Sequence, residues 1–452
     1  MADLAHLDRT ARRMKMLSQA LDSGRLGPVR RMVNTLTPAE IGNLLESLPP
    51  TKRLMLWGLV DAEDDGEVLV HCGEEVREAL LSDMDPDEIV AAAESLDIDD
   101  LAELFDDLPD TVTAEVLKSM DRDERERLEQ VLSYPEDTAG RLMAPDAVTV
   151  RADVTVDVVL RYLRLRGEIP DHTDFLYVVS RRNQYLGRLA IAQVLTSDPA
   201  TLVNTLMDDS QAPILVSVDD QEVARSFADH DWISAPVVDP NNVLLGRITI
   251  DDVVDIIRYQ ADHNVMSMAG LDEEEDLFSP VPRATRKRAL WLGINLATAF
   301  LASFVIGRFD VALEQIVALT ILMPVVASMG GIAGTQTLTL IVRGMALGQV
   351  GASNAAALLA KELKVGGFNG IVWAIVVGIA AGAWFGSLKL ALVIGAAVAI
   401  NLVVAAAAGV LIPLALRRMA VDPALAGGVI LTTVTDCLGF LAFLGLGTLF
   451  LL

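Results

Sequence analysis

The chain separates into two parts by the spacing of its apolar residues. Residues 289–452 contain five long, nearly uninterrupted apolar segments, which run over 289–307, 313–346, 357–384, 387–416 and 423–452. A helix needs roughly 20 apolar residues to cross the hydrocarbon core of a bilayer. The pattern therefore predicts an α-helical polytopic membrane domain with five transmembrane helices. Pro324 and the glycines that follow it predict a break in the second of them.

Residues 1–136 show short amphipathic helical patterns separated by prolines. Helix-start signals precede several of them, as at Thr37-Pro38-Ala39-Glu40, Asp85-Pro86-Asp87-Glu88, Asp97 and Asp121. A Thr or Asp cap, a proline in the first turn and a nearby carboxylate together suit the free amides of a helix start. This pattern predicts an acidic, all-α superhelical domain, whose simplest role is docking.

Residues 137–258 contain an internal duplication. Two β-branched runs, 175–179 and 233–238, are each followed by a turn and then by Leu-Gly-Arg, at 186–188 and 245–247. Such a pattern predicts two α/β units that pack as a pseudo-symmetric pair. The repeats resemble tandem CBS domains, modules that often sense a nucleotide or another small ligand. A charged linker helix over 259–288 is expected to join them to the membrane domain.

The formal charge is divided unequally between the two parts. The whole chain carries −26, whereas residues 1–282, with 25 basic and 57 acidic residues, carry −32. A surface of this sign excludes nucleic acid as a partner, because phosphate contacts need basic residues. Nearly all basic residues that flank the apolar segments fall on one side if that side is cytosolic. We therefore expect a multi-pass membrane protein with cytosolic acidic domains and the carboxyl terminus outside.

The sequence does not indicate an enzyme. Its five histidines are scattered, and it contains no HExxH, GxSxG or Walker-A pattern. Cys72 and Cys437 lie in different parts, so neither a disulfide framework nor a thiolate metal site is expected. The polar segment Met1–Leu17 favours a cytosolic amino terminus over a signal peptide.

Asp436 is the most informative single residue. It lies near the middle of the last apolar segment, after Thr432 and Thr433. A carboxylate at the centre of a membrane helix costs about 2.5–3.5 kcal/mol even on lenient insertion scales, and therefore needs a compensating partner. One interpretation is a cation site in a pore, with the threonine hydroxyls beside it. The alternative is a protonated carboxyl bonded to a neighbouring helix.

A second candidate stretch lies in the second apolar segment. Proline frees a backbone carbonyl, glycines permit close helix approach, and neutral oxygens follow, at Pro324, Gly330, Gly331, Gly334, Thr335 and Gln336. Carbonyl and hydroxyl oxygens suit a hard cation or its water shell. The alternative is glycine packing without a role in a pore. Asn295, Asn369 and Asn401 are weaker candidates that also suit bridges between helices.

Carboxylates crowd several positions of the acidic part. The candidates for Mg²⁺ binding are Asp99, Asp100, Glu103, Asp219, Asp220, Asp231, Asp252 and Asp255, and the linker adds the run Asp272–Asp276. Any one cluster also suits a solvated surface. At a charge of −32, however, packed acidic surfaces repel each other unless divalent cations lie between them. Mg²⁺ is suited to this because it keeps several waters and needs few protein ligands.

The chain resembles the MgtE family of magnesium channels in the order of its parts and in two membrane motifs. These motifs are Pro324…Gly330-Gly331…Gly334-Thr335-Gln336 and Asp422-Pro423-Ala424…Thr433…Asp436. The resemblance covers essentially the whole chain. It implies a homodimer with a pore at the dimer axis, where Asp436 selects hydrated Mg²⁺. It further implies a plug over 259–282 and cytosolic sensing carboxylates at Asp99, Glu103, Asp219, Asp231, Asp252 and Asp255.

With this resemblance, the leading hypothesis is a dimeric, Mg²⁺-selective uptake channel of the bacterial inner membrane that cytosolic Mg²⁺ closes. The alternatives are a secondary carrier that exchanges Mg²⁺ for Na⁺ or H⁺, and a membrane-anchored CBS sensor of nucleotides. An ATP site would be one-sided, because only the second repeat carries nucleotide-type residues, Thr249 and Asp252.

Overall fold

The computed structural model describes residue 20 and residues 26–271, 275–351, 353–419 and 421–452, without the side chain of residue 110. The chain forms two compact units: Met1–Gln260 with Glu274–Ser279, and Ala261–Glu273 with Pro280–Leu452. The predicted fold class is confirmed: helical and α/β parts precede five long apolar helices. The segment Met1–Leu17 and residues 272–274 of the acidic linker run lie outside the described residues.

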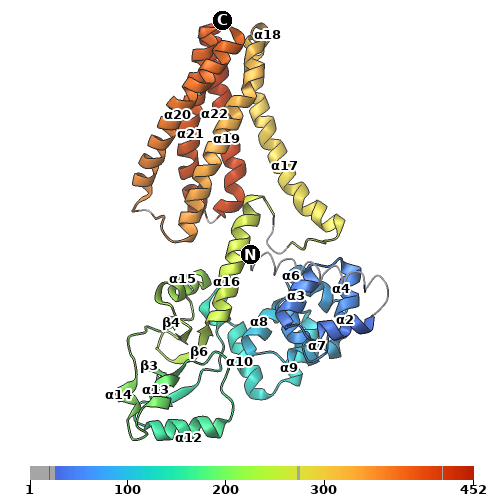
Figure 1. Ribbon diagram of the computed structural model, residues 1–452, viewed down its shortest axis with the longest axis vertical. Coiled ribbons are helices and arrows are strands. Elements are labelled where there is room, and N and C mark those ends of the chain that lie inside the picture. Colours follow the sequence, from blue (N-terminus) through green and yellow to red (C-terminus); the bar gives the residue numbers. More distant parts are fainter. Residues whose placement is uncertain (1–19, 21–25, 272–274, 352, 420) are drawn as a thin grey trace. The chain divides into compact units, whose positions relative to one another are not determined.

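The first unit begins with a series of short helices. They are α2 (Leu26–Val33), α3 (Pro38–Glu46), α4 (Pro50–Trp57), α5 (Asp65–Val70), α6 (Glu74–Leu81), α7 (Pro86–Ala93), α8 (Ile98–Asp106), α9 (Asp110–Ser119) and α10 (Arg122–Leu132) (Figure 1). Their starts follow the sequence signals: Thr37 and Glu40 form a capping box at α3, and Asp121 accepts from the Glu124 amide at α10. Each cap satisfies amides that the first helical turn leaves free.

Two α/β repeats follow. They comprise α11 (Ala139–Leu142), β1 (Thr149–Arg151), α12 (Val156–Arg166), β2 (Phe175–Val179), β3 (Tyr185–Ala190) and α13 (Ile191–Thr196), then α14 (Val203–Leu206), β4 (Ile214–Leu215), α15 (Asp220–His230), β5 (Ser234–Val238), β6 (Leu244–Thr249) and α16 (Ile250–Met268). In each sheet the first pair of strands is parallel and the second antiparallel. The register shifts at Val178/Val179 and again at Val237/Val238, so the duplication extends to its irregularities.

The repeated Leu-Gly-Arg motif has a structural cause. A Cβ at Gly187 would lie 2.7 Å from the Asp208 carbonyl, and one at Gly246 would lie 2.5 Å from the Ala144 carbonyl. Only glycine therefore lets the crossing backbone segment approach this closely. The arginine that follows each glycine pairs with an aspartate, since Arg188 binds Asp208 and Arg247 binds Asp146.

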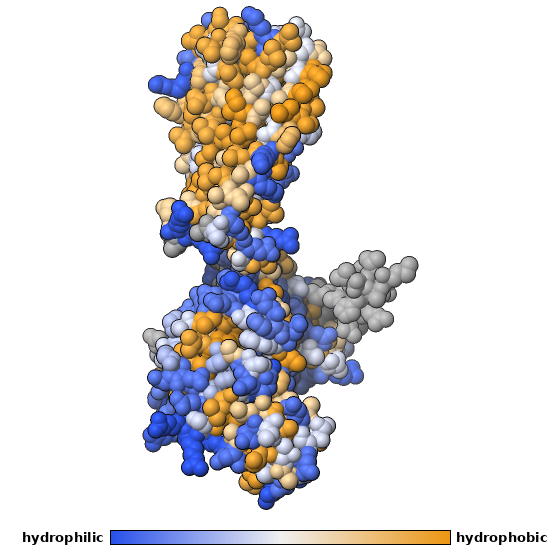
Figure 2. Space-filling model, turned by 90° about the vertical axis from the view of Figure 1, so that its left-hand side faces the viewer, coloured by the Kyte–Doolittle hydropathy of each residue, from blue (hydrophilic) through white to orange (hydrophobic). Residues whose placement is uncertain are grey.

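The second unit contains the long apolar helices. They are α17 (Val281–Ile306), continued by η1 (Gly307–Phe309) and α18 (Asp310–Gln315), and then α19 (Val317–Ala346), α20 (Ala355–Phe385), α21 (Leu388–Arg418) and α22 (Pro423–Leu451). Helices α19 to α22 form a bundle, and α17 diverges from it away from α18 (Figure 1). Figure 2 shows an apolar surface over these helices. In the most apolar 18 residues of the fourth span 61% of the residues are buried, whereas in those of the first span only 6% are. Helix α21 is therefore central in the bundle and α17 peripheral.

The predicted break in the second span lies elsewhere. Helix α19 runs through Pro324 and the glycines without interruption, and the chain instead bends at Ile316, where φ is −127° and ψ is 79°. Proline removes only one backbone hydrogen bond, and membrane helices tolerate this when neighbouring helices support them. Packing of α19 against α21 and α22 therefore outweighs the local signal.

The linker region is partly helical. Helix α16 continues from the second repeat to Met268, so it passes residue 258 without a break. Beyond it, Gly270 has a positive φ of 72°, and a Cβ there would lie 3.3 Å from the Trp291 ring of α17. Glycine allows both the left-handed turn and the close contact.

Candidate functional site

Carboxylates from α8 and α16 lie close together within the first unit. The pKa of Asp252 is raised to about 8, first by burial and then by the charges of Asp99 and Asp251. Burial, with the charges of Asp99 and Glu103 next, raises the pKa of Asp100 to about 7. Burial also raises the pKa of Asp99 to about 6. These groups repel each other when ionised, so a divalent cation would relieve the strain of bringing them together.

One oxygen of this cluster is available to a cation. Asp99 Oδ1 is buried and has no hydrogen-bond partner among the described residues. Asp252 Oδ2 accepts hydrogen bonds from the Thr249 amide at 3.1 Å and from the Thr249 hydroxyl at 3.0 Å. Glu103 is already paired, because it accepts from the Arg77 guanidinium at 2.7 Å. Within the described residues no three acidic, histidine or cysteine side chains already stand as a metal cage. The cluster therefore fits a cation that retains part of its water shell.

The structure brings together only some of the predicted sensing residues. Asp255 belongs to the same cluster. Burial raises its pKa, the nearby His71 lowers it, and the charge of Glu103 raises it further. Asp219 instead caps the start of α15, and Asp231 ends that helix in a left-handed conformation. The ends of an 11-residue helix are about 16 Å apart, so these two cannot share one ion. Asp220 lies beside Asp219, which raises its pKa after burial.

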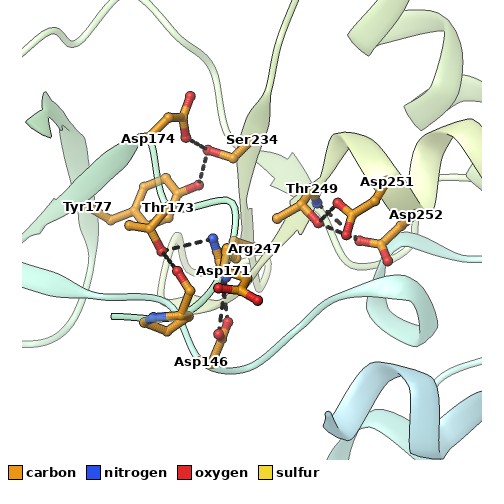
Figure 3. Close-up of polar contacts among 11 residues, drawn as sticks. Asp146, Asp171, Thr173, Asp174, Tyr177, Ser234, Arg247, Thr249, Asp251 and Asp252 are labelled. Atoms are coloured by element: carbon orange, nitrogen blue, oxygen red, sulfur yellow. Dashed lines mark hydrogen bonds and ion pairs between the residues drawn. The ribbon is translucent and has the colours of Figure 1, made fainter. Parts of the chain in front are cut away.

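A cavity of about 590 Å³ adjoins the cluster, and most of its charged lining residues are acidic. Asp97, Asp99, Asp146, Asp171 and Asp251 line it, with few cations between them. The buried Arg247 guanidinium is engaged: it binds both Asp146 oxygens, at 3.0 and 3.1 Å, and the Asp171 carbonyl at 2.8 Å (Figure 3).

The residues predicted for ATP lie beside this cavity. Thr249 and Asp252 bind each other at the start of α16, and the Thr249 hydroxyl also contacts Asp251 (Figure 3). A triphosphate would meet carboxylates here, with Arg247 already paired to Asp146. The residues present therefore suit a divalent cation and do not suit a free nucleotide anion.

In the second unit, Asp436 is half-exposed near the middle of α22. Thr432 and Thr433 precede it by four and three residues, so all three lie on neighbouring positions of one helix face. Both threonine hydroxyls donate to carbonyls of their own helix, to Gly428 at 2.8 Å and to Val429 at 2.7 Å. Their lone pairs therefore remain available as acceptors.

The glycines of α19 divide into two kinds. A Cβ at Gly330 would lie 2.2 Å from Asn401 Nδ2, and one at Gly334 would lie 2.9 Å from Leu431. These two glycines therefore pack against neighbouring helices. Gly331 has open space where its Cβ would be, and Thr335 and Gln336 are exposed on the same helix. The Thr335 hydroxyl donates to the Gly331 carbonyl at 2.9 Å.

Three protein-family models match the chain: MgtE, described as a divalent cation transporter, over 323–446, the MgtE intracellular N domain over 36–137, and the CBS domain over 210–259. The magnesium transporter MgtE of Bacillus subtilis (strain 168) is 27% identical over 431 residues, 95% of this chain and 96% of the relative. That of Thermus thermophilus is 29% identical over 440 residues, 96% and 98% of the two chains. A solved cytosolic domain of the Mg²⁺ channel MgtE in complex with ATP is 30% identical, covers 54% of this chain and 99% of its own, and has a TM-score of 0.49.

The chain belongs to the MgtE family. The resemblance in the membrane motifs is thereby confirmed, since the MgtE model spans the stretch from Met323 to beyond Asp436. The MgtE intracellular N domain model includes Asp99, Asp100 and Glu103 on α8.

Two polar groups of the membrane helices escaped sequence reasoning or were undervalued by it. Glu362 of α20 is only 4% exposed, accepts from the Thr337 hydroxyl at 3.3 Å and binds Lys361 at 2.5 Å. It stands between Lys361 and Lys364 near the start of a span, and nothing in its local sequence signals that it is buried. Asn401 of α21 is wholly buried and donates to the Val326 carbonyl of α19 at 2.9 Å, so it bridges helices.

Proposed function

We propose that the chain is a homodimeric, Mg²⁺-selective channel for Mg²⁺ uptake across the bacterial inner membrane. The observation that carries the proposal is the half-exposed Asp436 near the middle of α22, on a face with Thr432 and Thr433. A carboxylate at that depth is costly unless water and a cation accompany it. The names of the relatives, magnesium transporters, support Mg²⁺ as the ion.

Exposed polar groups on two helices support a dimer with a central path. Thr335 and Gln336 on α19 and Thr432 on α22 are exposed in the single chain. Facing lipid, the Gln336 amide and the half-exposed Asp436 carboxylate would lie away from water, whereas two chains meeting along these faces would enclose them, with the two threonines, around water. The hydroxyls and the carboxylate would then contact the outer oxygens of a hydrated ion.

The acidic cluster supports closure by cytosolic Mg²⁺. Asp99, Asp100 and Asp252 resist ionisation together, and a cation bound among them holds α8 against α16. When Mg²⁺ is scarce the ionised groups repel, and the helical domain and the linker over 259–282 are released. Moving a gate from 1:99 to 99:1 takes about 5.5 kcal/mol of differential binding, which several weakly bound ions supply.

The topology completes the proposal. The acidic domains lie in the cytosol and the carboxyl terminus outside, because basic residues such as Arg343, Arg417 and Arg418 then lie on the cytosolic side. A carrier that exchanges Mg²⁺ for Na⁺ or H⁺ and a nucleotide sensor that is merely anchored are the competing functions.

Mg²⁺ flux into liposomes containing the purified protein tests the proposal. Asp436→Asn removes the charge with little change of volume, and we expect it to reduce flux to the level of empty liposomes. Asp310→Asn makes the same change at an exposed position at the start of α18 and should keep wild-type flux. Wild-type flux in Asp436→Asn would contradict the proposed path.

Single-channel recording separates the competing functions. Discrete open levels that Mg²⁺ on the cytosolic side abolishes support a gated channel. Flux that depends on a Na⁺ or H⁺ gradient indicates a carrier, and wild-type protein without any flux leaves only the sensor.

A further inference from the structure

Asn401 joins three helices of the membrane domain at mid-depth. It lies near the middle of α21 and is 0% exposed. Its Nδ2 donates to the Val326 carbonyl of α19 at 2.9 Å. The bond spans 75 positions of the sequence and fixes one point of α21 to one point of α19.

Two glycines make room for this amide, one on each neighbouring helix. A Cβ at Gly330 of α19 would lie 2.2 Å from Asn401 Nδ2, and a Cβ at Gly439 of α22 would lie 2.6 Å from the same atom. The side chain therefore fills a space that only glycine on both sides leaves open. It holds α19 and α22 at one separation and one register.

The polar character of this residue is costly in itself. Asn401 Oδ1 is buried and has no hydrogen-bond partner among the described residues. A buried acceptor without a donor destabilises a fold, and leucine would fill similar volume without that cost. Packing alone therefore does not explain an amide here. The hydrogen bond to Val326, which sets the helix register, does.

The clamped points lie next to the groups of the proposed path. Gly439 follows Asp436 by three residues, and Gly330 immediately precedes Gly331, one turn before Thr335. A shift of α22 along or about its axis at Gly439 would therefore move the Asp436 carboxylate relative to the exposed groups of α19.

We propose that Asn401 is a positioning residue of the permeation path, which sets the distance between Asp436 and the exposed face of α19 and thereby the ion that passes. This inference rests on the function proposed above. Asn401 itself does not contact the ion. Ions of different hydrated size are separated by the spacing of oxygens, so selectivity depends on register as well as on charge.

Flux ratios between Mg²⁺ and Ca²⁺ in liposomes test the role. Asn401→Ala removes the hydrogen bond and replaces the amide by a smaller side chain that causes no clash. We expect the Mg²⁺/Ca²⁺ flux ratio to fall about three- to tenfold, the range that one hydrogen bond between membrane helices is worth. Ser303→Ala removes a polar group from an exposed position of α17 and should leave the ratio unchanged.

The glycine on α22 provides an independent test. Gly439→Ala forces a methyl group into the Asn401 amide and should lower the ratio, whereas Gly445→Ala on the same helix meets open space and should not. Combining Gly439→Ala with Asn401→Ala removes the clash and should restore thermal stability but not the ratio. Rescue of both properties would overturn the proposal, because space-filling would then be the whole role.

Other outcomes are equally decisive. If Asn401→Ala lowers the melting temperature but the folded protein keeps the wild-type ratio, Asn401 is structural only and the proposal fails. If the wild-type protein shows no flux, the proposed function fails instead. The helix register is then read directly from spin-label distances between exposed Leu340 of α19 and Leu449 of α22. The clamp predicts a broader distance distribution in Asn401→Ala, and an unchanged one would overturn it.

Discussion

Arg53 of α4 and Asp276, 223 positions further along the chain, form a buried ion pair with an N–O distance of 2.8 Å. The two side chains are 3% and 4% exposed. Arg53 also donates to the Leu45 and Leu48 carbonyls, so the guanidinium is held by the end of α3 and by the linker segment at once. Glu75 of α6 adds a second attachment, because it accepts from the Asp276 amide and the Ser279 hydroxyl.

Replacing Asp276 should destabilise the helical domain that contains its partner, Arg53. Asp276→Ala strands the Arg53 charge in a buried site, and breaking a buried pair in this way costs about 3–5 kcal/mol. Hydrogen exchange of the α3 and α4 amides in the full chain measures this as a loss of opening free energy. Asp157→Ala breaks the exposed pair with Arg161 and should cost less than about 1 kcal/mol. Equal effects of the two variants would contradict the expectation that burial makes the Arg53–Asp276 pair the more important of the two.

The acidic cluster makes stability depend on pH in a defined direction. The pKa values of Asp99, Asp100 and Asp252 are raised to about 6, 7 and 8. A solvated carboxyl has a pKa of about 4, so between about pH 4 and pH 8 the unfolded chain holds fewer protons than the folded one. The contribution of these three carboxyls to the free energy of unfolding is therefore fully present below about pH 4. It is lost as the pH rises through their pKa values in the folded protein. Without Mg²⁺, the thermal unfolding midpoint of the soluble part should fall steadily from about pH 5 to pH 8.5.

Asp252→Asn isolates the main contributor to this pH dependence. The amide oxygen can still accept from Thr249, so the start of α16 keeps its cap while the charge is lost. We expect a higher unfolding midpoint at about pH 8 without Mg²⁺, a flatter pH profile and a smaller gain on adding Mg²⁺. An unchanged profile would show that Asp252 ionises freely and would remove it from the proposed cation site.

Sequence reasoning succeeded where a signal is local. Caps at Thr37 and Asp121 placed the starts of α3 and α10, and the β-branched run Phe175–Val179 coincides with β2. It failed at Pro324, where tertiary packing overrides a local break. The pairings of Arg53 with Asp276 and of Asn401 with Val326 leave no local trace, because each joins segments distant in sequence. Family resemblance grouped the carboxylates of α8 and α16, but it also included Asp219 and Asp231, which lie at the two ends of α15.

The duplicated repeats contain their own matched pair of variants. Arg247 binds Asp146 with a side chain that is 6% exposed, whereas the equivalent Arg188 binds Asp208 with side chains that are 17% and 40% exposed. Asp146→Ala should cost about 2–4 kcal/mol, somewhat less than a fully buried pair because Asp146 is partly solvated. Asp208→Ala should cost less than about 1 kcal/mol. Urea denaturation followed by circular dichroism measures both, and a larger loss for Asp208→Ala would show that burial does not govern these pairs.

Asp422 links the start of α22 to the end of α16. Its two oxygens accept from the Ala424 amide at 2.8 Å and the Leu425 amide at 3.2 Å, and Oδ2 lies 3.3 Å from His263 Nε2. Asp422→Ala leaves both amides of this helix start free and should weaken the first turn by about 0.5–2 kcal/mol. Asp422→Asn keeps one acceptor and should fall between this variant and the wild type. Hydrogen exchange at Ala424 and Leu425 reports the loss, and protection that is equal in all three proteins would mean that the α22 start is held by packing alone.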